Sequence, residues 1–151
     1  MKIYLGSDHA GLELKDKLAE FLKQNGHQAE DLGPSTYDAE DDYPDYAVKV
    51  CEKVLGENAY GILLCGTGQG MDRVANKFPG IDAALCWDEL TAKVAREHGD
   101  TNILCIGSKT ITEDLAKKIV QIWLTESFSN KERHKRRIAK IRDIESRYLK
   151  K

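Results

Sequence analysis

The chain has 151 residues, a length typical of a single domain that can bury one substantial core. Hydrophobic residues make up 41% and charged residues 32%, values that exclude disordered and fibrous classes. No apolar run approaches the length of a membrane span, and the first residues lack the basic-then-apolar layout of a signal peptide. We therefore expect a cytoplasmic protein that does not insert into a membrane.

The net charge of −2 conceals an uneven distribution. Residues 131–151 hold ten Lys/Arg and three Asp/Glu, a net of +7, so the other 130 residues carry −9. Such a basic segment could meet an acidic neighbour, a phosphate or nucleic acid. The segment has no nucleic-acid-reading motif, and its one aromatic residue, Tyr148, belongs to an apolar stripe. We therefore do not expect a nucleic-acid partner.

Short apolar runs alternate with helical patterns along the chain. The predicted strands are residues 2–6, 27–33, 60–65, 81–87 and 102–107. The predicted helices are residues 12–25, 45–55, 70–77, 88–98, 112–128 and 131–149. This alternation predicts an α/β fold in which a doubly wound, Rossmann-like parallel sheet has helices on both faces. The common order for five such strands is 2-1-3-4-5.

No linker or repeat divides this pattern, so residues 1–151 are expected to form a single domain. The last helix follows the complete alternation and repeats Ile138, Ile141, Ile144 and Tyr148 at steps of three and four residues. A stripe with this period is one face of an amphipathic helix. It could cover a partner subunit or the chain's own sheet.

Two Gly-rich turns follow the first and third predicted strands, GSDHAG (6–11) and CGTGQG (65–70). In a doubly wound sheet, ligands bind at the carboxyl ends of the strands where the strand order reverses, which here is between these two strands. Neither turn is a nucleotide motif. Leu12-Glu13 replaces the Lys-Ser/Thr of a P-loop, and Met71 replaces the third glycine of the dinucleotide fingerprint. We expect a crevice for a different ligand.

Cys65 stands directly before the second turn. A Gly-rich turn lets successive N–H groups converge on one oxygen, and the N-terminus of the following helix favours negative charge. The same terminus would favour the thiolate that a cysteine base requires. On Cys65 alone a buried strand end would be the preferred interpretation, but together with the adjacent turn the pattern equally indicates a reaction that develops an oxyanion. We interpret Cys86 and Cys105 as small buried hydrophobic residues, without disulfides.

Other polar residues leave alternatives open. Asp8 and His9 lie at the predicted ligand face, where Asp8 is either a helix cap or a catalytic group. His98 ends a predicted helix and could simply interact with its C-terminus. Arg133 and Arg137, four residues apart, are either a solvated face or a bidentate phosphate site. No His/Cys/Asp cluster has metal-ligand spacing, so we expect no metal.

Taken in order, these motifs resemble the type B ribose-5-phosphate isomerases, whose relatives are the galactose-6-phosphate and allose-6-phosphate isomerases. The matching segments are GSDHAG, DYP (42–44), CGTG (65–68), ANKFPGI (75–81), REHGDTN (96–102), IGS (106–108) and RHKRR (133–137). The resemblance spans nearly the whole chain. It implies a five-stranded parallel sheet in a homodimer or homotetramer, active sites at the subunit interface, and no metal or organic cofactor.

The resemblance also implies roles for individual residues. Cys65 matches the base that moves a proton between C2 and C1, Thr67 lies beside the enediolate, and His98, helped by Asp8, opens the furanose ring. The implied substrate contacts are His9, Tyr43, Gly66, Gly68, Gln69, Gly70, Gly99, Lys109, Arg133 and Arg137. The two arginines would hold the phosphate, from the neighbouring subunit.

Several positions depart from the usual pattern of that family. Gly99 stands where a substrate-binding asparagine is common, and Lys109 replaces a frequent arginine. Gln69, Asp72 and Arg73 occupy a stretch that usually holds apolar and small residues. We expect an isomerase that interconverts ribose 5-phosphate and ribulose 5-phosphate. The alternatives are an isomerase of a hexose 6-phosphate and a non-catalytic sugar-phosphate sensor.

Overall fold

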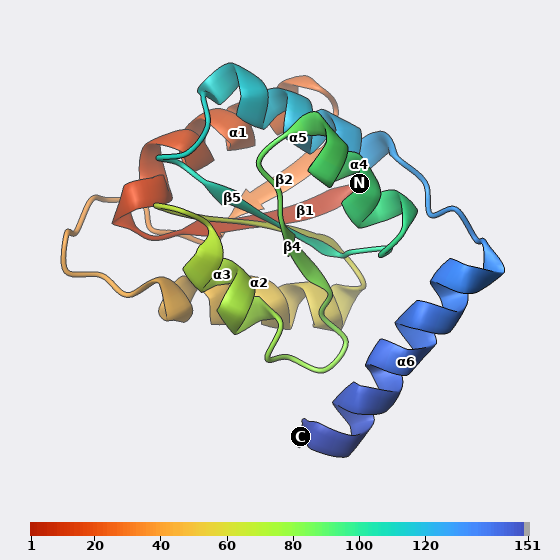
Figure 1. Ribbon diagram of the computed structural model, residues 1–151. Coiled ribbons are helices and arrows are strands. Elements are labelled where there is room, and N and C mark those ends of the chain that lie inside the picture. Colours follow the sequence, from red (N-terminus) through yellow and green to blue (C-terminus); the bar gives the residue numbers. More distant parts are fainter. Residues whose placement is uncertain (150–151) are drawn as a thin grey trace.

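The computed structural model describes residues 1–149, and within them five strands form one parallel sheet (Figure 1). The strands are β1 (Lys2–Ser7), β2 (Gln28–Asp31), β3 (Tyr60–Cys65), β4 (Ala83–Leu85) and β5 (Ile103–Gly107). The helices are the short 3-10 helix η1 (His9–Gly11), α1 (Leu12–Gln24), α2 (Tyr43–Glu57), α3 (Gln69–Ala75), α4 (Glu89–Glu97), α5 (Glu113–Thr125) and α6 (Glu132–Tyr148). The predicted α/β class is confirmed.

The strand order is β2-β1-β3-β5-β4, so the predicted order 2-1-3-4-5 is wrong in its last two strands. Burial gives the physical reason. All five residues of β5 are buried, which suits a central strand, whereas the three residues of β4 are only partly buried. The side chain of Asn76 covers this edge: its Nδ2 donates to Ala83 O at 3.0 Å and its Oδ1 accepts from Ala83 N at 2.9 Å. The reversal between β1 and β3 is as predicted.

Helices cover both faces of the sheet, with α1, α4 and α5 on one side and α2 and α3 on the other (Figure 1). Successive side chains of β1 point to opposite faces, as a strand requires. Ile3 and Leu5 pack in the cluster that contains Trp123 of α5, and Tyr4 packs in the cluster that contains Val50 of α2. Each face of the sheet therefore has its own apolar core.

The helix boundaries follow local chemistry. Helix α2 begins at Tyr43, two residues before the predicted start, because Pro44 fits the first turn of a helix and Asp42 precedes it in an extended conformation. Helix α5 begins after Thr112, whose hydroxyl accepts from the N–H of Leu115 at 3.2 Å, as predicted.

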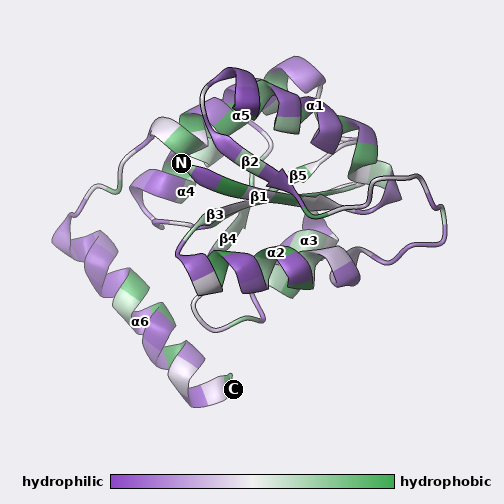
Figure 2. Cartoon of the chain, turned by 180° about the vertical axis from the view of Figure 1, so that it is seen from behind, coloured by the Kyte–Doolittle hydropathy of each residue, from purple (hydrophilic) through white to green (hydrophobic). Residues whose placement is uncertain are grey.

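Helix α6 stands away from the sheet in both views (Figures 1 and 2). Arg142 pairs with Asp82, and the Glu145 carboxylate accepts from the N–H of Gly80 at 3.0 Å. Its apolar stripe is open: Ile141, Ile144 and Tyr148 are 52%, 51% and 73% exposed. The stripe therefore does not cover the chain's own sheet. Across residues 1–149, no helix combines the length and apolar character needed to span a bilayer.

Candidate active site

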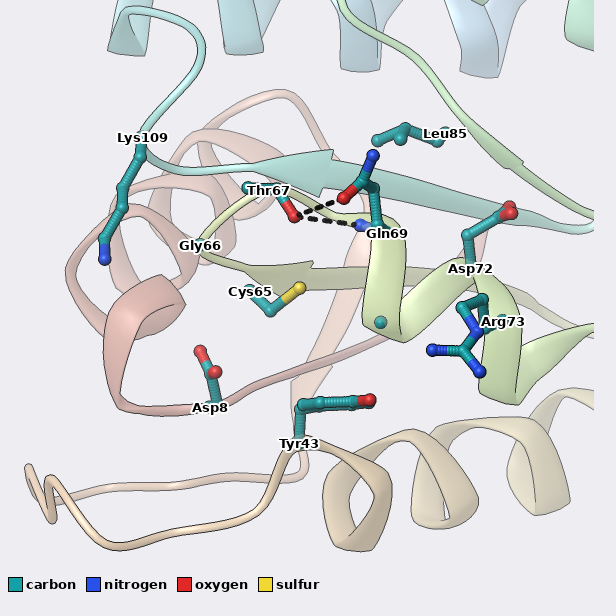
Figure 3. Close-up of a pocket in the computed structure, with 11 residues that line it drawn as sticks. Asp8, Tyr43, Cys65, Gly66, Thr67, Gln69, Asp72, Arg73, Leu85 and Lys109 are labelled. Carbon is teal, nitrogen blue, oxygen red and sulfur yellow. Dashed lines mark hydrogen bonds between the residues drawn. The ribbon is translucent and has the colours of Figure 1, made fainter.

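A pocket of about 780 Å³ opens at the carboxyl ends of β1 and β3, at the predicted crevice (Figure 3). It brings together eight of the predicted site residues: Asp8, Tyr43, Cys65, Gly66, Thr67, Gln69, Gly70 and Lys109. Asp72, Arg73 and Leu85 complete its lining. Figure 3 shows Cys65 between two cationic side chains, Lys109 at one end of the pocket and Arg73 at the other.

Cys65 is the last residue of β3 and is 5% exposed. Its Sγ accepts a hydrogen bond from the backbone N–H of Gly68, with a distance of 3.2 Å between nitrogen and sulfur. Burial raises the pKa of Cys51 and of Cys86 to about 12, and raises that of Cys105 above its ordinary value. Cys65 is therefore the cysteine placed for chemistry, because it both faces the pocket and receives a donor.

The turn after Cys65 depends on two glycines. Gly68 has φ +79°, and a Cβ there would collide with the side chain of Leu85 and come within 3.0 Å of the Ile106 carbonyl carbon. A Cβ on Gly70 would lie 2.6 Å from Cζ of Tyr43. The missing side chains thus let the turn pack on β5 and let the Tyr43 ring close one wall of the pocket.

Ser108 fastens this turn to its neighbours. Its N–H donates to the carbonyl of Cys65 at 2.9 Å, and its hydroxyl donates to the carbonyl of Ala10 at 2.7 Å. The next residue, Lys109, donates its N–H to the Gly66 carbonyl at 2.9 Å. The turns after β1, β3 and β5 are therefore joined by two backbone hydrogen bonds and one from the Ser108 hydroxyl, which hold the pocket lining in place.

Asp8 has the first of the two roles considered from the sequence, that of a helix cap, and its catalytic role stays a prediction. Its carboxylate caps η1 by accepting from the N–H of Gly11 at 3.1 Å, and it also lines the pocket. His9 faces an adjacent pocket of about 510 Å³ that shares Lys109 as a wall. The Nδ1 atom of His9 lies 2.6 Å from Oδ1 of Asp41. This hydrogen bond raises the pKa of His9, and partial burial opposes the rise.

Asp8, His9 and Asp41 also offer potential metal ligands within 4.8 Å of one another. The sequence does not reveal this group, because Asp41 is 32 residues from His9. The 2.6 Å separation is the length of a charge-assisted hydrogen bond, so we describe His9 and Asp41 as an ion pair.

Four predicted site residues lie elsewhere. His98 and Gly99 follow α4, and Arg133 and Arg137 lie in the first turns of α6. Both segments are at the amino ends of the strands, opposite the pocket. Strand β3 has six residues, so at about 3.3 Å per residue its ends lie roughly 17 Å apart. One chain therefore does not bring these four residues to Cys65.

This second group has its own order. The rings of His98 and His134 stack with their centroids 4.1 Å apart, and His134 Nδ1 lies 2.5 Å from the Ser129 hydroxyl. His134 is 3% exposed. Burial is the main cause of its lowered pKa, and the charges of His98 and the nearby arginines act in the same direction. His134 is thus a buried platform on which the His98 ring stacks.

Residues 3–141 match the family described as Ribose/Galactose Isomerase. The chain belongs to this family. It is 41% identical over 146 residues to a ribose-5-phosphate isomerase B of Mycobacterium tuberculosis, a match that covers 96% of this chain and 90% of the relative.

Solved structures agree with this membership of the ribose/galactose isomerases. A Clostridium thermocellum ribose-5-phosphate isomerase B superposes with a TM-score of 0.94 at 44% identity, covering 98% of this chain and 99% of that one. A Mycoplasma genitalium ribose-5-phosphate isomerase B with bound ribulose-5-phosphate superposes with a TM-score of 0.92 at 44% identity, covering 96% of both chains.

Sequence reasoning missed three residues that lie near the candidate site. Asp41 stands in the sequence only as one member of an acidic run, and Ser108 only as part of the IGS motif; the run consists of Asp38, Glu40, Asp41, Asp42 and Asp45. Leu85 carries no chemical signal and lines the pocket because β4 ends there. The acidic run could have suggested a partner for His9, but nothing in the spacing selects Asp41 from its neighbours.

Proposed function

We propose that this protein interconverts ribose 5-phosphate and ribulose 5-phosphate through an enediolate. The observation that carries the proposal is the Cys65 thiol, which faces a polar pocket and accepts a hydrogen bond from Gly68 N–H. The bound ribulose-5-phosphate of the Mycoplasma genitalium relative, at 44% identity, supports the same substrate here.

In the proposed reaction, His98 and Asp8 assist opening of the furanose ring, which exposes the C1 aldehyde. The Cys65 thiolate then removes the proton from C2. The electrons of that C–H bond form a C1=C2 double bond, and negative charge develops on O1. Return of that proton to C1, with transfer of the O2 proton to O1 and formation of the C2=O2 carbonyl, gives the ketose. General base catalysis of this kind contributes about 10²–10⁴-fold.

The turn after Cys65 would stabilise the enediolate. Thr67 and Gln69 are exposed to the pocket at the start of α3, where helix N–H groups lack partners in their own helix. Each donor aimed at a developing oxyanion is worth about 10²–10³-fold. The backbone bonds from Ser108 and Lys109 support this role, because they fix the turn before the substrate arrives.

The proposed active unit is a two-fold homodimer. In one chain, Cys65 lies at the carboxyl ends of the strands. At their amino ends lie His98, Gly99, Arg133 and Arg137, so a second chain must supply these four residues. An isologous interface would place two such sites symmetrically. The open apolar stripe of α6 supports this arrangement, because pairing would bury Ile141 and Ile144. The cytoplasmic location stays a prediction.

The phosphate would bind between the two chains. Arg133 and Arg137 of one subunit and Lys109 and His9 of the other supply cations for a group that carries about −1.5 to −2 charges. The bidentate geometry of arginine suits phosphate oxygens. This arrangement leaves the C1 end of the sugar at Cys65.

The substrate is tested by measuring turnover of ribose 5-phosphate, allose 6-phosphate and galactose 6-phosphate on one preparation. We expect the highest kcat/KM for ribose 5-phosphate. A preference for a hexose phosphate would overturn the pentose assignment and would assign the departures at Gln69, Gly99 and Lys109 to a larger sugar. Tight binding without exchange of the C2 proton into heavy water would identify a sensor instead.

A further inference from the structure

One carboxylate oxygen makes two hydrogen bonds to His9. Asp41 Oδ1 accepts from the backbone N–H of His9 at 3.1 Å and lies 2.6 Å from Nδ1 of the ring. Asp41 belongs to the loop between β2 and α2, and His9 belongs to η1. Two bonds to the same residue fix both its backbone and the rotation of its ring.

The Asp41 side chain is only 7% exposed. Its second oxygen, Oδ2, is buried and has no hydrogen-bond partner among residues 1–149. A buried carboxylate is costly unless a positive group pairs with it. Within the described part of the chain, His9 is the ion-pair partner of Asp41. The protonated form of His9 is therefore the one that this loop stabilises.

The pairing also sets the direction of the other ring nitrogen. Because Nδ1 faces Asp41, Nε2 is left for the pocket that His9 shares with Lys109. The Tyr37 ring meets the imidazole edge-on, with centroids 5.7 Å apart, and supports the same orientation. A protonated imidazole donates from both nitrogens. His9 can thus donate to Asp41 through Nδ1 and to an oxyanion through Nε2.

We propose that Asp41 is a positioning residue for substrate binding, holding His9 as an oriented cation whose Nε2–H donates to the substrate phosphate beside Lys109. The inference rests on the proposed function for the identity of the anion. It adds a residue outside the main pocket, from a loop that the reaction scheme does not otherwise use.

The charged groups around His9 determine whether its contribution to phosphate binding is gained or lost as pH rises. Asp41 and Asp8 raise the pKa of His9, and Lys109 lowers it. Glu13 and Asp16 of α1 line the same pocket and add negative charge. A raised pKa keeps His9 cationic to higher pH than an ordinary histidine, so its contribution to phosphate binding is fully present below the ordinary histidine pKa of about 6.5 and persists above it. That contribution is lost as pH rises through the pKa of the folded protein.

The first test follows the His9 ring directly by NMR titration in the full-length protein. In Asp41→Asn the midpoint should fall, so a smaller fraction of His9 is charged at pH values between the two midpoints. Binding of inorganic phosphate in that pH range should weaken in proportion to the loss of the charged form. Glu40→Gln is the matched control: it removes one charge from the same exposed loop without a contact to His9, and both quantities should stay unchanged.

The second test separates positioning from general structure. Asp41→Asn should raise KM for ribose 5-phosphate more than it lowers kcat, and should move the alkaline limb of kcat/KM to lower pH. In a His9→Gln background the same change should have no further effect on KM, because the two residues act as one unit. Asp41→Glu, which keeps the charge, should recover part of the affinity, and it replaces Asp41→Asn if that variant does not fold.

An unchanged His9 midpoint and unchanged phosphate affinity in folded Asp41→Asn would overturn the inference. Additive effects of Asp41→Asn and His9→Gln on KM would also overturn it. The titration needs no turnover, so a lowered midpoint in a protein that isomerises no sugar would refute the proposed function and leave the Asp41–His9 relationship standing.

Discussion

The backbone N–H of Gly68 donates to Sγ of Cys65 across 3.2 Å. Gly68 adopts φ +79°, a left-handed conformation that favours glycine, and the chain enters α3 directly after it. An N–H donor stabilises a thiolate more than a thiol, because a charged acceptor strengthens the hydrogen bond. The shape of the turn and the hydrogen bonding of the sulfur are therefore linked through one residue.

Replacing Gly68 with alanine should damage the site. The left-handed conformation costs an alanine about 1–2 kcal/mol, and the added Cβ would meet Leu85 and the backbone of Ile106. Relief of that clash would move the N–H away from Cys65. We expect kcat to fall by about 10²-fold, the usual cost of one lost donor to a developing charge. Steady-state kinetics and thermal unfolding measure the two effects.

Gly26→Ala is the matched control for this prediction. Gly26 has φ +82°, nearly the same backbone strain, but a Cβ there would have no heavy atom within 4 Å. Gly26→Ala should lower the free energy of unfolding by about 1 kcal/mol and leave kcat unchanged. Equal losses of kcat in the two variants would mean that general strain, and not the geometry at Cys65, controls activity.

The proposed shared site makes a prediction about mixed dimers. Cys65→Ala and His98→Asn should each be inactive alone. In a dimer of one chain of each kind, one site carries both substitutions and the other carries neither. Random pairing gives half mixed dimers, so about a quarter of the wild-type activity should return after the two variants are unfolded and refolded together.

If each chain held its own complete site, co-refolding would restore nothing beyond the activities of the separate variants. Mixing the two folded variants without exchange of subunits is the control, and it should stay inactive. Recovery of activity there would point to exchange of subunits between the folded dimers.

His134 should weaken the fold in acid. Its pKa is lowered mainly by burial, and by the charges of His98, Arg133 and Arg137. The unfolded chain therefore binds more protons than the folded one as pH falls below the ordinary histidine pKa of about 6.5. Stability is then fully present above that pH and declines toward the lower pKa of the folded state.

Melting temperatures between pH 7.5 and pH 5 test this expectation. In His134→Gln the melting temperature should fall less on acidification than in the wild type. Some dependence of the melting temperature on pH should remain, because burial also lowers the pKa of His27. An unchanged pH slope in His134→Gln would show that the buried imidazole is not a source of acid sensitivity.

Chelation should not affect turnover. Asp8, His9 and Asp41 are close enough to hold a cation, but the Nδ1 atom of His9 is engaged with Asp41, and the proposed proton transfer depends on Cys65. We expect equal kcat and KM for ribose 5-phosphate before and after dialysis against EDTA. Loss of activity that returns on addition of a divalent cation would make this cluster a metal site.

Much of the fold could be predicted because each strand is an apolar run between helical patterns. The crevice could be placed for the same reason, since the Gly-rich turns follow the two strands at the reversal of strand order. The order of β4 and β5 in the sheet could not be predicted, because two parallel strands of similar composition differ only in burial. Asp82 within the predicted fourth strand was the one sign of an edge.

Contacts between distant segments were beyond the sequence. His9 and Asp41 are brought together by the loop before α2, and His98 and His134 by the path from α5 into α6. Pattern and spacing report neighbours along one element and do not report which loops meet. The residues that the family resemblance assigned to one site fall at opposite ends of the strands, a separation visible only in three dimensions.

The most direct test of the account is release of deuterium from C2-labelled ribose 5-phosphate by the wild type and by Cys65→Ala. The account predicts that release slows by at least about 10²-fold, the usual contribution of a general base, while sugar-phosphate affinity stays within a few-fold. Release at the wild-type rate from folded Cys65→Ala would contradict it, because another group would then be removing the proton.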